Sequence, residues 1–173
     1  MIEYFAYGSN MNLKHLHDFF HRFGVEAEGV VNPRRVVLPD YRLRTNYLTT
    51  SGLGAANIAP RPGDAVEGIL LTISPDAQDA LRAKEGWKHR YDETIVEVTL
   101  PSNGETILAF TYQVTPEHRL SLDVAVSPKY RSLILAGAEE AGLSPEYQEH
   151  LRRILKPAPD MPTPSHDDTA MCK

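Results

Sequence analysis

Between Val30 and Ile73 the sequence consists of short β-type segments separated by proline and glycine, and this alternation restricts the fold more than any other feature. The segments are RRVVL, YRLRTNYL, AANIAP and AVEGILLTI. Proline and glycine end or bend an extended segment before it becomes long. Such a region is therefore expected to form a curled sheet or a small barrel from several short strands.

Residues 91–114 are predicted to form a β-hairpin. Apolar residues occupy alternate positions on both sides of Asn103-Gly104, a dipeptide typical of tight hairpin turns. The alternating residues are Val96, Val98 and Leu100 before the turn, and Leu108, Phe110 and Tyr112 after it. This is the firmest local signal in the chain.

A strand is predicted at residues 2–7, where aromatic and β-branched residues run into a Gly-Ser-Asn turn. A helix follows, because Asn12 can cap its start and Gly24 suits a left-handed residue at its end. Apolar residues recur at helical spacing between them, which predicts one buried face. These residues are Leu13, Leu16, Phe19, Phe20 and Phe23.

Three further helices are predicted from one start signal, Ser-Pro, in which serine caps the helix and proline occupies its first turn. The first of them stops at Gly86, so that Glu85 is its last residue. The other two are separated by Gly142 and are expected to form an αα-hairpin. The capping serines are Ser74, Ser127 and Ser144.

The composition is that of one domain. The 173 residues are 42% apolar, enough for a single core, and we expect a domain over 1–156 with a mobile, proline-rich tail over 157–173. A net charge of -5 disfavours nucleic acid or an anionic membrane as a partner. The lone cysteine, Cys172, excludes a disulfide framework and fits a reducing cytoplasm. No apolar run approaches the roughly 18 residues of a membrane span.

The turn after the first strand, Gly8-Ser9-Asn10, is the first candidate site. Successive backbone N–H groups in such a turn can hold a carboxylate or a developing oxyanion, and glycine allows a ligand to approach the backbone closely. The same residues are also common where a strand simply ends. Ser9 as a nucleophile is disfavoured, because the chain has no Gly-x-Ser-x-Gly elbow.

Glu85 is the second candidate. A carboxylate in the last turn of a helix faces the negative end of the helix dipole. If Trp87 and Tyr91 also shield it from water, its pKa rises, and it becomes a better base near neutral pH. The alternative is a solvated glutamate before a helix-ending glycine.

A metal site and an arginine clamp are weaker candidates. His17 and His21 could share a helix face, but no H-E-x-x-H pattern, cysteine or acidic cluster supplies further ligands. We therefore expect polar-face histidines and no metal or cofactor. The arginines of the strand-like segments are expected to be mostly solvated, although one could pair with a substrate carboxylate.

Five motifs in order resemble the γ-glutamylcyclotransferase family, the AIG2-like group. They are YFAYGSNM at 4–11, PDYRL at 39–43, PGDAVEG at 62–68, LRAKEGW at 81–87 with Tyr91 beyond it, and SPKYRSLILAGAEEAGLSPEYQEHL at 127–151. The resemblance implies an α+β fold, a small closed mixed β-barrel with flanking helices, and a pocket at its mouth for a γ-glutamyl group.

The resemblance also implies site residues. Glu85 matches the catalytic acid/base, Tyr130 of the Ser-Pro-x-Tyr motif reaches the substrate, and Tyr91 forms a pocket wall, with a spacing from Glu85 that varies among relatives. The first strand and turn line the substrate site, largely through backbone contacts. These lining residues are Tyr4, Phe5, Ala6, Tyr7, Gly8, Ser9 and Asn10.

The implied reaction is an intramolecular aminolysis. The α-amine of a γ-glutamyl amide attacks its own γ-carbonyl, which gives 5-oxoproline and releases the amine without an enzyme nucleophile or metal. Glu85 would carry the proton, and the N–H groups of the turn would hold the carboxylate or the oxyanion. The partner is a small-molecule γ-glutamyl substrate. The oligomeric state stays open, although members of the family are often dimers.

Rival readings keep the same fold. The substrate could be glutathione, a γ-glutamyl amine or a γ-glutamylated biosynthetic intermediate, although the asparagine of YGSN and the C-terminal helix pair resemble the branch that cuts γ-glutamyl amino acids. A non-catalytic binding module is the other alternative. Retention of Glu85 counts against it, because binding alone needs no base.

Overall fold

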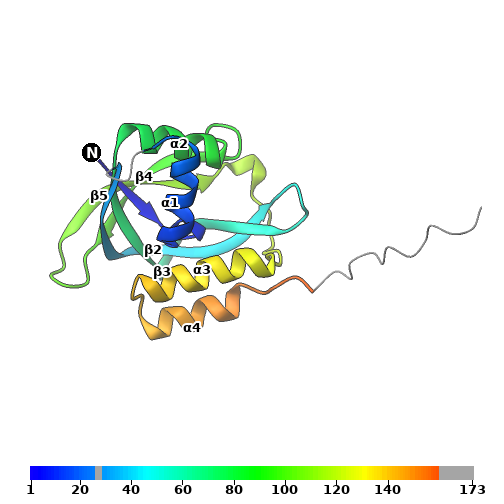
Figure 1. The fold of residues 1–173 in the computed structure, drawn as a ribbon. Coiled ribbons are helices and arrows are strands. Elements are labelled where there is room, and N and C mark those ends of the chain that lie inside the picture. Colours follow the sequence, from blue (N-terminus) through cyan, green and yellow to red (C-terminus); the bar gives the residue numbers. More distant parts are fainter. Residues whose placement is uncertain (26–28, 160–173) are drawn as a thin grey trace, which may run out of the picture.

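The structure is a computed structural model that describes residues 1–25 and 29–159. Five strands close into a mixed barrel in the order β1-β3-β2-β4-β5, which confirms the predicted fold class (Figure 1). Neighbouring strands are antiparallel except β1 and β5, which pair in parallel at Tyr4 and Phe110. The strands are β1 (Ile2–Ala6), β2 (Val30–Leu48), β3 (Gly54–Ile73), β4 (Tyr91–Thr99) and β5 (Thr106–Val114).

The prediction of several short strands between Val30 and Ile73 is wrong. Two long strands, β2 and β3, cross this region and pair over most of their length. The punctuating residues lie at irregularities rather than at strand ends: the register shifts between Pro39 and Tyr41. At this bulge the N–H of Gly63 donates to the carboxylate of Asp40 at 2.8 Å. A bulge absorbs residues that a regular ladder rejects, so the strands continue through it.

The predicted hairpin of β4 and β5 is confirmed, with one exception in its burial. Val98, Phe110 and Tyr112 are buried as the alternation indicates, but Leu108 is 65% exposed. Leu108 pairs with Glu97 and Phe110 with Ile95, so the apolar set of β5 lies on the face of the hairpin opposite to Val96 and Val98. Alternation therefore indicated which residues of one strand share a face, but not that the two sets lie on different faces.

The helices begin where the Ser-Pro signals place them. Each capping serine accepts a hydrogen bond from the backbone N–H three residues later. Helices α3 and α4 run side by side as an αα-hairpin, with α2 on the other side of the barrel in this view (Figure 1). The helices are α1 (Leu13–Arg22), α2 (Pro75–Glu85), α3 (Pro128–Glu140) and α4 (Pro145–Ile154), with short 3-10 turns η1 (Ser9–Met11) and η3 (Pro116–His118).

One core fills the barrel and the spaces beneath the helices. Phe5 and Leu70 are fully buried within it. Gly68 is required there, because a β-carbon at this position would lie 2.7 Å from the ring of Phe5. Within the described ranges no helix is long and apolar enough to cross a membrane. The predicted mobile tail falls mostly on residues 160–173, which lie outside the described residues.

Candidate active site

A small pocket of about 40 Å³ lies where β1 and β5 end and β4 begins. Its walls come from segments far apart in the chain: the first strand and turn, the end of α2, the hairpin strands and the start of α3. The lining residues are Tyr4, Tyr7, Gly8, Ser9, Asn10, Ala56, Glu85, Tyr91, Tyr112 and Tyr130. The pocket therefore joins the two candidate sites that the sequence indicated, the glycine turn and Glu85.

The turn after β1 has unpaired donors, as predicted. It forms the 3-10 turn η1, in which the N–H of Met11 donates to the carbonyl of Gly8 at 3.0 Å. In the described ranges, no backbone carbonyl accepts from the N–H groups of Gly8, Ser9 or Asn10. These groups lie at the pocket and can donate to an anionic or carbonyl oxygen of a ligand.

Glu85 is the last residue of α2, as the helix signals predict. Gly86 follows it in the left-handed conformation with a φ of 67°, which ends the helix. The carboxylate of Glu85 accepts a hydrogen bond from the side-chain amide of Asn10 at 3.1 Å. Burial raises its pKa above the usual value, while the positive charge of Lys84, the Asn10 hydrogen bond and Arg90 act in the opposite direction.

Asn10 is the centre of a polar network beside Glu85. Its amide nitrogen also donates to the hydroxyl of Tyr4 at 2.8 Å. Its amide oxygen accepts from the ammonium group of Lys84, which lies 4.8 Å above the ring of Phe19. An ammonium group can only donate, so Lys84 fixes which end of the amide faces Glu85. The sequence alone does not single out Lys84, because no local pattern distinguishes it from a solvated lysine.

Replacing Lys84 with methionine should shift the acid limb of the pH profile of kcat/KM to higher pH. The ammonium charge holds the pKa of Glu85 down, and methionine keeps the unbranched chain without the charge. A base with a higher pKa becomes active only at higher pH. Lys88→Met is the matched control, because Lys88 is exposed and lies 4.4 Å from the ring of Trp87 instead. An acid limb that stays in place in Lys84→Met would contradict the prediction.

Tyr91 and Tyr130 bracket the backbone of one residue of β3, Ala56. The hydroxyl of Tyr91 donates to the carbonyl of Ala56 at 3.1 Å, and the N–H of Ala56 donates to the hydroxyl oxygen of Tyr130 at 3.1 Å. Tyr91 therefore offers a lone pair to a ligand, whereas Tyr130 still has a proton to donate. Burial raises the pKa of Tyr130 to about 12, although the Ala56 N–H partly opposes this. Both hydroxyls are protonated at neutral pH.

Three residues proposed from the sequence do not line the pocket. Phe5 points into the core beside Gly68, and Ala6 is buried without reaching the pocket. Trp87 does not shield Glu85: the guanidinium of Arg82 lies 4.3 Å from its ring, on a different side of the helix end. The shielding comes instead from the tyrosines of the pocket.

Two lining residues were missed. Ala56 has no polar side chain that could mark it, and its backbone takes part in the site only through two distant tyrosines. Tyr112 was assigned only to the apolar face of the hairpin, yet its hydroxyl donates to Glu93 at 3.0 Å. A signal was present, because a buried tyrosine needs a hydrogen-bond partner for its hydroxyl.

Gly8 leaves room for the pocket. Its φ of -116° is negative, so this position does not use the left-handed conformation that favours glycine. A β-carbon at Gly8 would lie 3.4 Å from that of Ala56 and 3.5 Å from the hydroxyl of Tyr130. These are ordinary contact distances, but the added β-carbon would take up room in the pocket between the turn and α3.

For the γ-glutamyl substrate that the resemblance implies, Gly8→Val should raise the KM by about tenfold or more, because its methyl groups extend beyond that β-carbon into the pocket. Gly8→Ala is the graded comparison and should have a smaller effect, since one methyl group fits at contact distance. Steady-state kinetics and thermal unfolding of both variants check this. An unchanged KM in Gly8→Val would mean that the turn does not contact the substrate.

The residues of the described ranges contain no group of three or more histidine, cysteine or carboxylate side chains that could hold a metal ion. His17 and His21 are exposed on α1. The pocket itself supplies one carboxyl group, several phenolic hydroxyls and free backbone N–H groups. This set can bind a small zwitterion and move a proton.

Comparisons with known proteins agree with this arrangement. A family model described as AIG2-like matches residues 65–151. The chain is 30% identical over 161 residues to a gamma-glutamylcyclotransferase of Bos taurus, covering 87% of this chain and 77% of that protein. A solved gamma-glutamyl cyclotransferase is similar with a TM-score of 0.78 and 27% identity over 99% of this chain and 93% of that one. YkqA from Bacillus subtilis has a TM-score of 0.75 and 30% identity, covering 89% of this chain and 54% of YkqA.

Proposed function

Because the chain belongs to the AIG2-like, γ-glutamylcyclotransferase family, we propose that it converts a γ-glutamyl amino acid or peptide to 5-oxoproline and the free amino acid or peptide. The observation that carries the proposal is the position of Glu85. Its carboxyl group lies in a pocket with free backbone N–H groups, fixed by Asn10, and its pKa is raised by burial. A site that only bound a ligand would not need a base tuned in this way.

The reaction needs little beyond folding the substrate and moving protons from the α-ammonium group, which loses two, to the departing nitrogen, which gains two. The α-amine attacks the γ-carbonyl, a new C–N bond closes the five-membered ring, and the C–N bond to the leaving amine breaks. Holding the amine against the carbonyl in a small pocket exploits proximity, for which effective molarities reach about 10⁵ M or more. A metal or covalent intermediate is not part of this scheme.

Glu85 would carry the proton. As the carboxylate it takes a proton from the α-ammonium group, and as the acid it returns one to the departing nitrogen. A second proton leaves the ring nitrogen once the new C–N bond has formed and follows the same route, so that the amine departs as an ammonium group. General acid/base catalysis of this kind contributes about 10²- to 10⁴-fold. The raised pKa suits both halves of the cycle, because a carboxyl group with an ordinary pKa is a weak base and is rarely protonated at neutral pH.

Charge on the substrate oxygens would be held by the hydrogen-bond donors of the pocket. Within the described ranges no backbone carbonyl accepts from the N–H groups of Gly8, Ser9 or Asn10, and the hydroxyl proton of Tyr130 is not used by Ala56. These donors suit the α-carboxylate and the oxygen that becomes negative during attack. We assign these donors to the α-carboxylate and the developing oxyanion together, without dividing them between the two.

One experiment separates the proposal from its rivals. The protein is incubated with γ-glutamyl-alanine, γ-glutamyl-cysteine, glutathione and γ-glutamyl-lysine, and 5-oxoproline is measured. We expect release from the first two. Release from glutathione or γ-glutamyl-lysine alone would move the assignment to the rival substrate. Binding without any release would indicate a binding module.

A further inference from the structure

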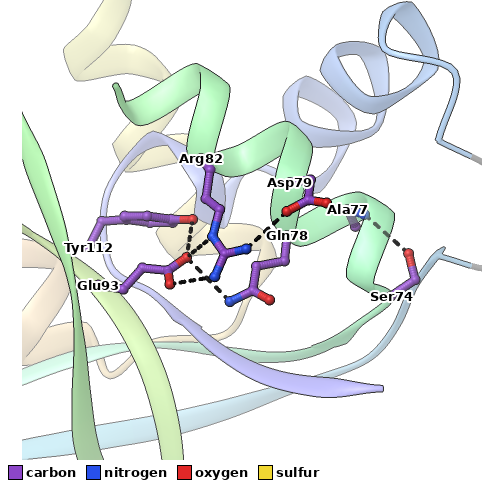
Figure 2. Close-up of polar contacts among 7 residues, drawn as sticks. All are labelled: Ser74, Ala77, Gln78, Asp79, Arg82, Glu93 and Tyr112. Carbon is purple, nitrogen blue, oxygen red and sulfur yellow. Dashed lines mark hydrogen bonds and ion pairs between the residues drawn. The ribbon is translucent and has the colours of Figure 1, made fainter. Parts of the chain in front are cut away.

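A second carboxylate, Glu93, lies behind the pocket wall and belongs to a network that the proposed reaction does not use. Figure 2 shows Tyr112, Glu93 and Arg82 meeting between the hairpin and helix α2. Tyr112 and Glu93 are cross-strand partners on β5 and β4. Arg82 lies one turn before Glu85 on the same helix. The network therefore joins a pocket wall to the helix that carries Glu85.

Glu93 is held in place from several directions. The guanidinium of Arg82 donates from Nε to Oε1 and from Nη2 to Oε2, both at 2.8 Å. Gln78 donates a third hydrogen bond to Oε1 at 3.2 Å. Arg82 is itself fixed by Asp79 at 2.9 Å and by the ring of Trp87. A two-point arginine–carboxylate pair has a defined geometry, so Glu93 presents Oε1 to Tyr112 in one orientation (Figure 2).

The pairing of Glu93 with Arg82 determines the direction of the hydrogen bond between Tyr112 and Glu93. A carboxylate paired with a guanidinium can only accept, so Tyr112 must donate, and it does so at 3.0 Å. Burial, followed by the nearby hydroxyl of Tyr4 and the charge of Glu93, raises the pKa of Tyr112, so the proton stays on the tyrosine. The oxygen then has only lone pairs left for a ligand.

We propose that Glu93, held by Arg82, is a positioning residue that draws the proton of Tyr112 out of the pocket, so that Tyr112 accepts a hydrogen bond from the α-amine of the γ-glutamyl substrate. This rests on the proposed function. Tyr91 has the same polarity, because its proton is given to the carbonyl of Ala56. Glu85, Tyr91 and Tyr112 thus form an acceptor side of the pocket, complementary in polarity to the neighbouring donors of the turn and Tyr130.

These acceptors explain how the α-amine could be oriented toward the γ-carbonyl. An ammonium group has three N–H bonds, and after Glu85 takes one proton two remain. Two tyrosine oxygens can hold these two N–H bonds, which leaves the nitrogen lone pair free to face the carbonyl. A tyrosine whose proton pointed into the pocket would instead compete for that lone pair.

The test compares a ligand that has the amine with one that lacks it. γ-Glutamyl-alanine is the substrate, and glutaryl-alanine, which has no amine and cannot cyclise, is the inhibitor. In Tyr112→Phe and in Glu93→Gln we expect the KM of γ-glutamyl-alanine to rise by about tenfold, as for loss of a hydrogen bond to a charged group. The inhibition constant of glutaryl-alanine should stay within about twofold of wild type.

Asp76→Asn is the matched control, because Asp76 is an exposed acid in the first turn of the same helix, and within the described residues it makes no hydrogen bond or ion pair with Arg82, Glu93 or Tyr112. It should leave both constants unchanged. Tyr112→Phe keeps the ring, so it tests the hydroxyl even if Glu93→Gln unfolds, and thermal unfolding reports the fold of each variant.

Three results would overturn the inference. Equal weakening of both ligands would indicate general damage to the wall, and unchanged constants would mean that Tyr112 does not meet the amine. Absence of 5-oxoproline from the wild-type protein would remove the proposed function as well. If the wild-type protein releases 5-oxoproline but Tyr112→Phe weakens both ligands equally, the inference about Tyr112 is wrong and the proposed function stands.

Discussion

Glu85→Gln is expected to lower kcat/KM for 5-oxoproline release by about 10² to 10⁴-fold, because glutamine cannot take or return a proton. The amide has nearly the same shape as the carboxyl group and can still face Asn10, which lies 3.1 Å away. KM should therefore change less than kcat. Steady-state assay of the purified variant checks this, and near wild-type turnover would remove Glu85 from the mechanism.

Glu140→Gln is the control for this substitution. Glu140 is also the last residue of its helix, α3, but it is exposed and does not line the pocket. It should keep wild-type kinetics. The pair separates the effect of the pocket from that of changing a glutamate at the end of a helix.

Glu85→Gln should also be more resistant to heat than wild type at neutral pH. Burial raises the folded-state pKa of Glu85 above its usual 4.5. For an acid, this means that the folded state loses stability relative to the unfolded state as pH rises from the unfolded pKa through the folded one. Glutamine has no charge to bury, so the variant avoids that loss. The difference in Tm should disappear below about pH 4.5, where both states of wild type are protonated.

Gly137→Ala is expected to reduce both stability and activity. Gly137 lies in α3 against the turn after β1, and a β-carbon there would be 2.6 Å from the backbone nitrogen of Asn12 and 2.8 Å from the carbonyl carbon of Met11. Both are main-chain atoms, so the helix must move away. Crowding of this kind costs about 1 to 3 kcal/mol. Helix propensity alone predicts the opposite result, because alanine favours a helix over glycine by about 1 kcal/mol. A measured loss of stability would therefore show that the crowding outweighs the propensity.

The activity loss follows because α3 also carries Tyr130. The hydroxyl of Tyr130 would be 3.5 Å from a β-carbon at Gly8 and accepts from Ala56 at 3.1 Å. Shifting the helix by about 1 Å can cost about 10²-fold in kcat/KM. Ser132→Ala, on the exposed face of α3, should leave both the free energy of unfolding and kcat/KM unchanged. A stabilised, fully active Gly137→Ala variant would show that the contact can relax without moving the site.

The parts of the site that the sequence predicts are those governed by local signals. The start of α2 at Ser74-Pro75 and its end at Gly86 are local, and together they place Glu85 at the helix terminus. The turn after β1 is equally local. The fold class came from the resemblance, while the residues by themselves indicated only a curled sheet or a barrel.

The rest depends on contacts that no local pattern contains. Phe5 is adjacent to Tyr4, but successive residues of a strand face opposite sides, so the chain sends only one of them to the pocket. Lys84, Ala56 and Tyr112 act through partners 35 to 74 residues away or across the hairpin. The sequence predicts several short strands in place of β2 and β3, because proline and glycine occur both at bulges and at strand ends.

The contact between Asn10 and Glu85 spans 75 residues, and the pocket walls run from Tyr4 to Tyr130. The pocket therefore has no precursor in any segment of the chain: it comes into existence only after the first strand has joined β3 and β5 and both α2 and α3 have docked. Such long-range closure is slow compared with the formation of helices. During renaturation from denaturant, recovery of turnover should lag behind the return of the helical circular dichroism signal and coincide with burial of the tyrosines.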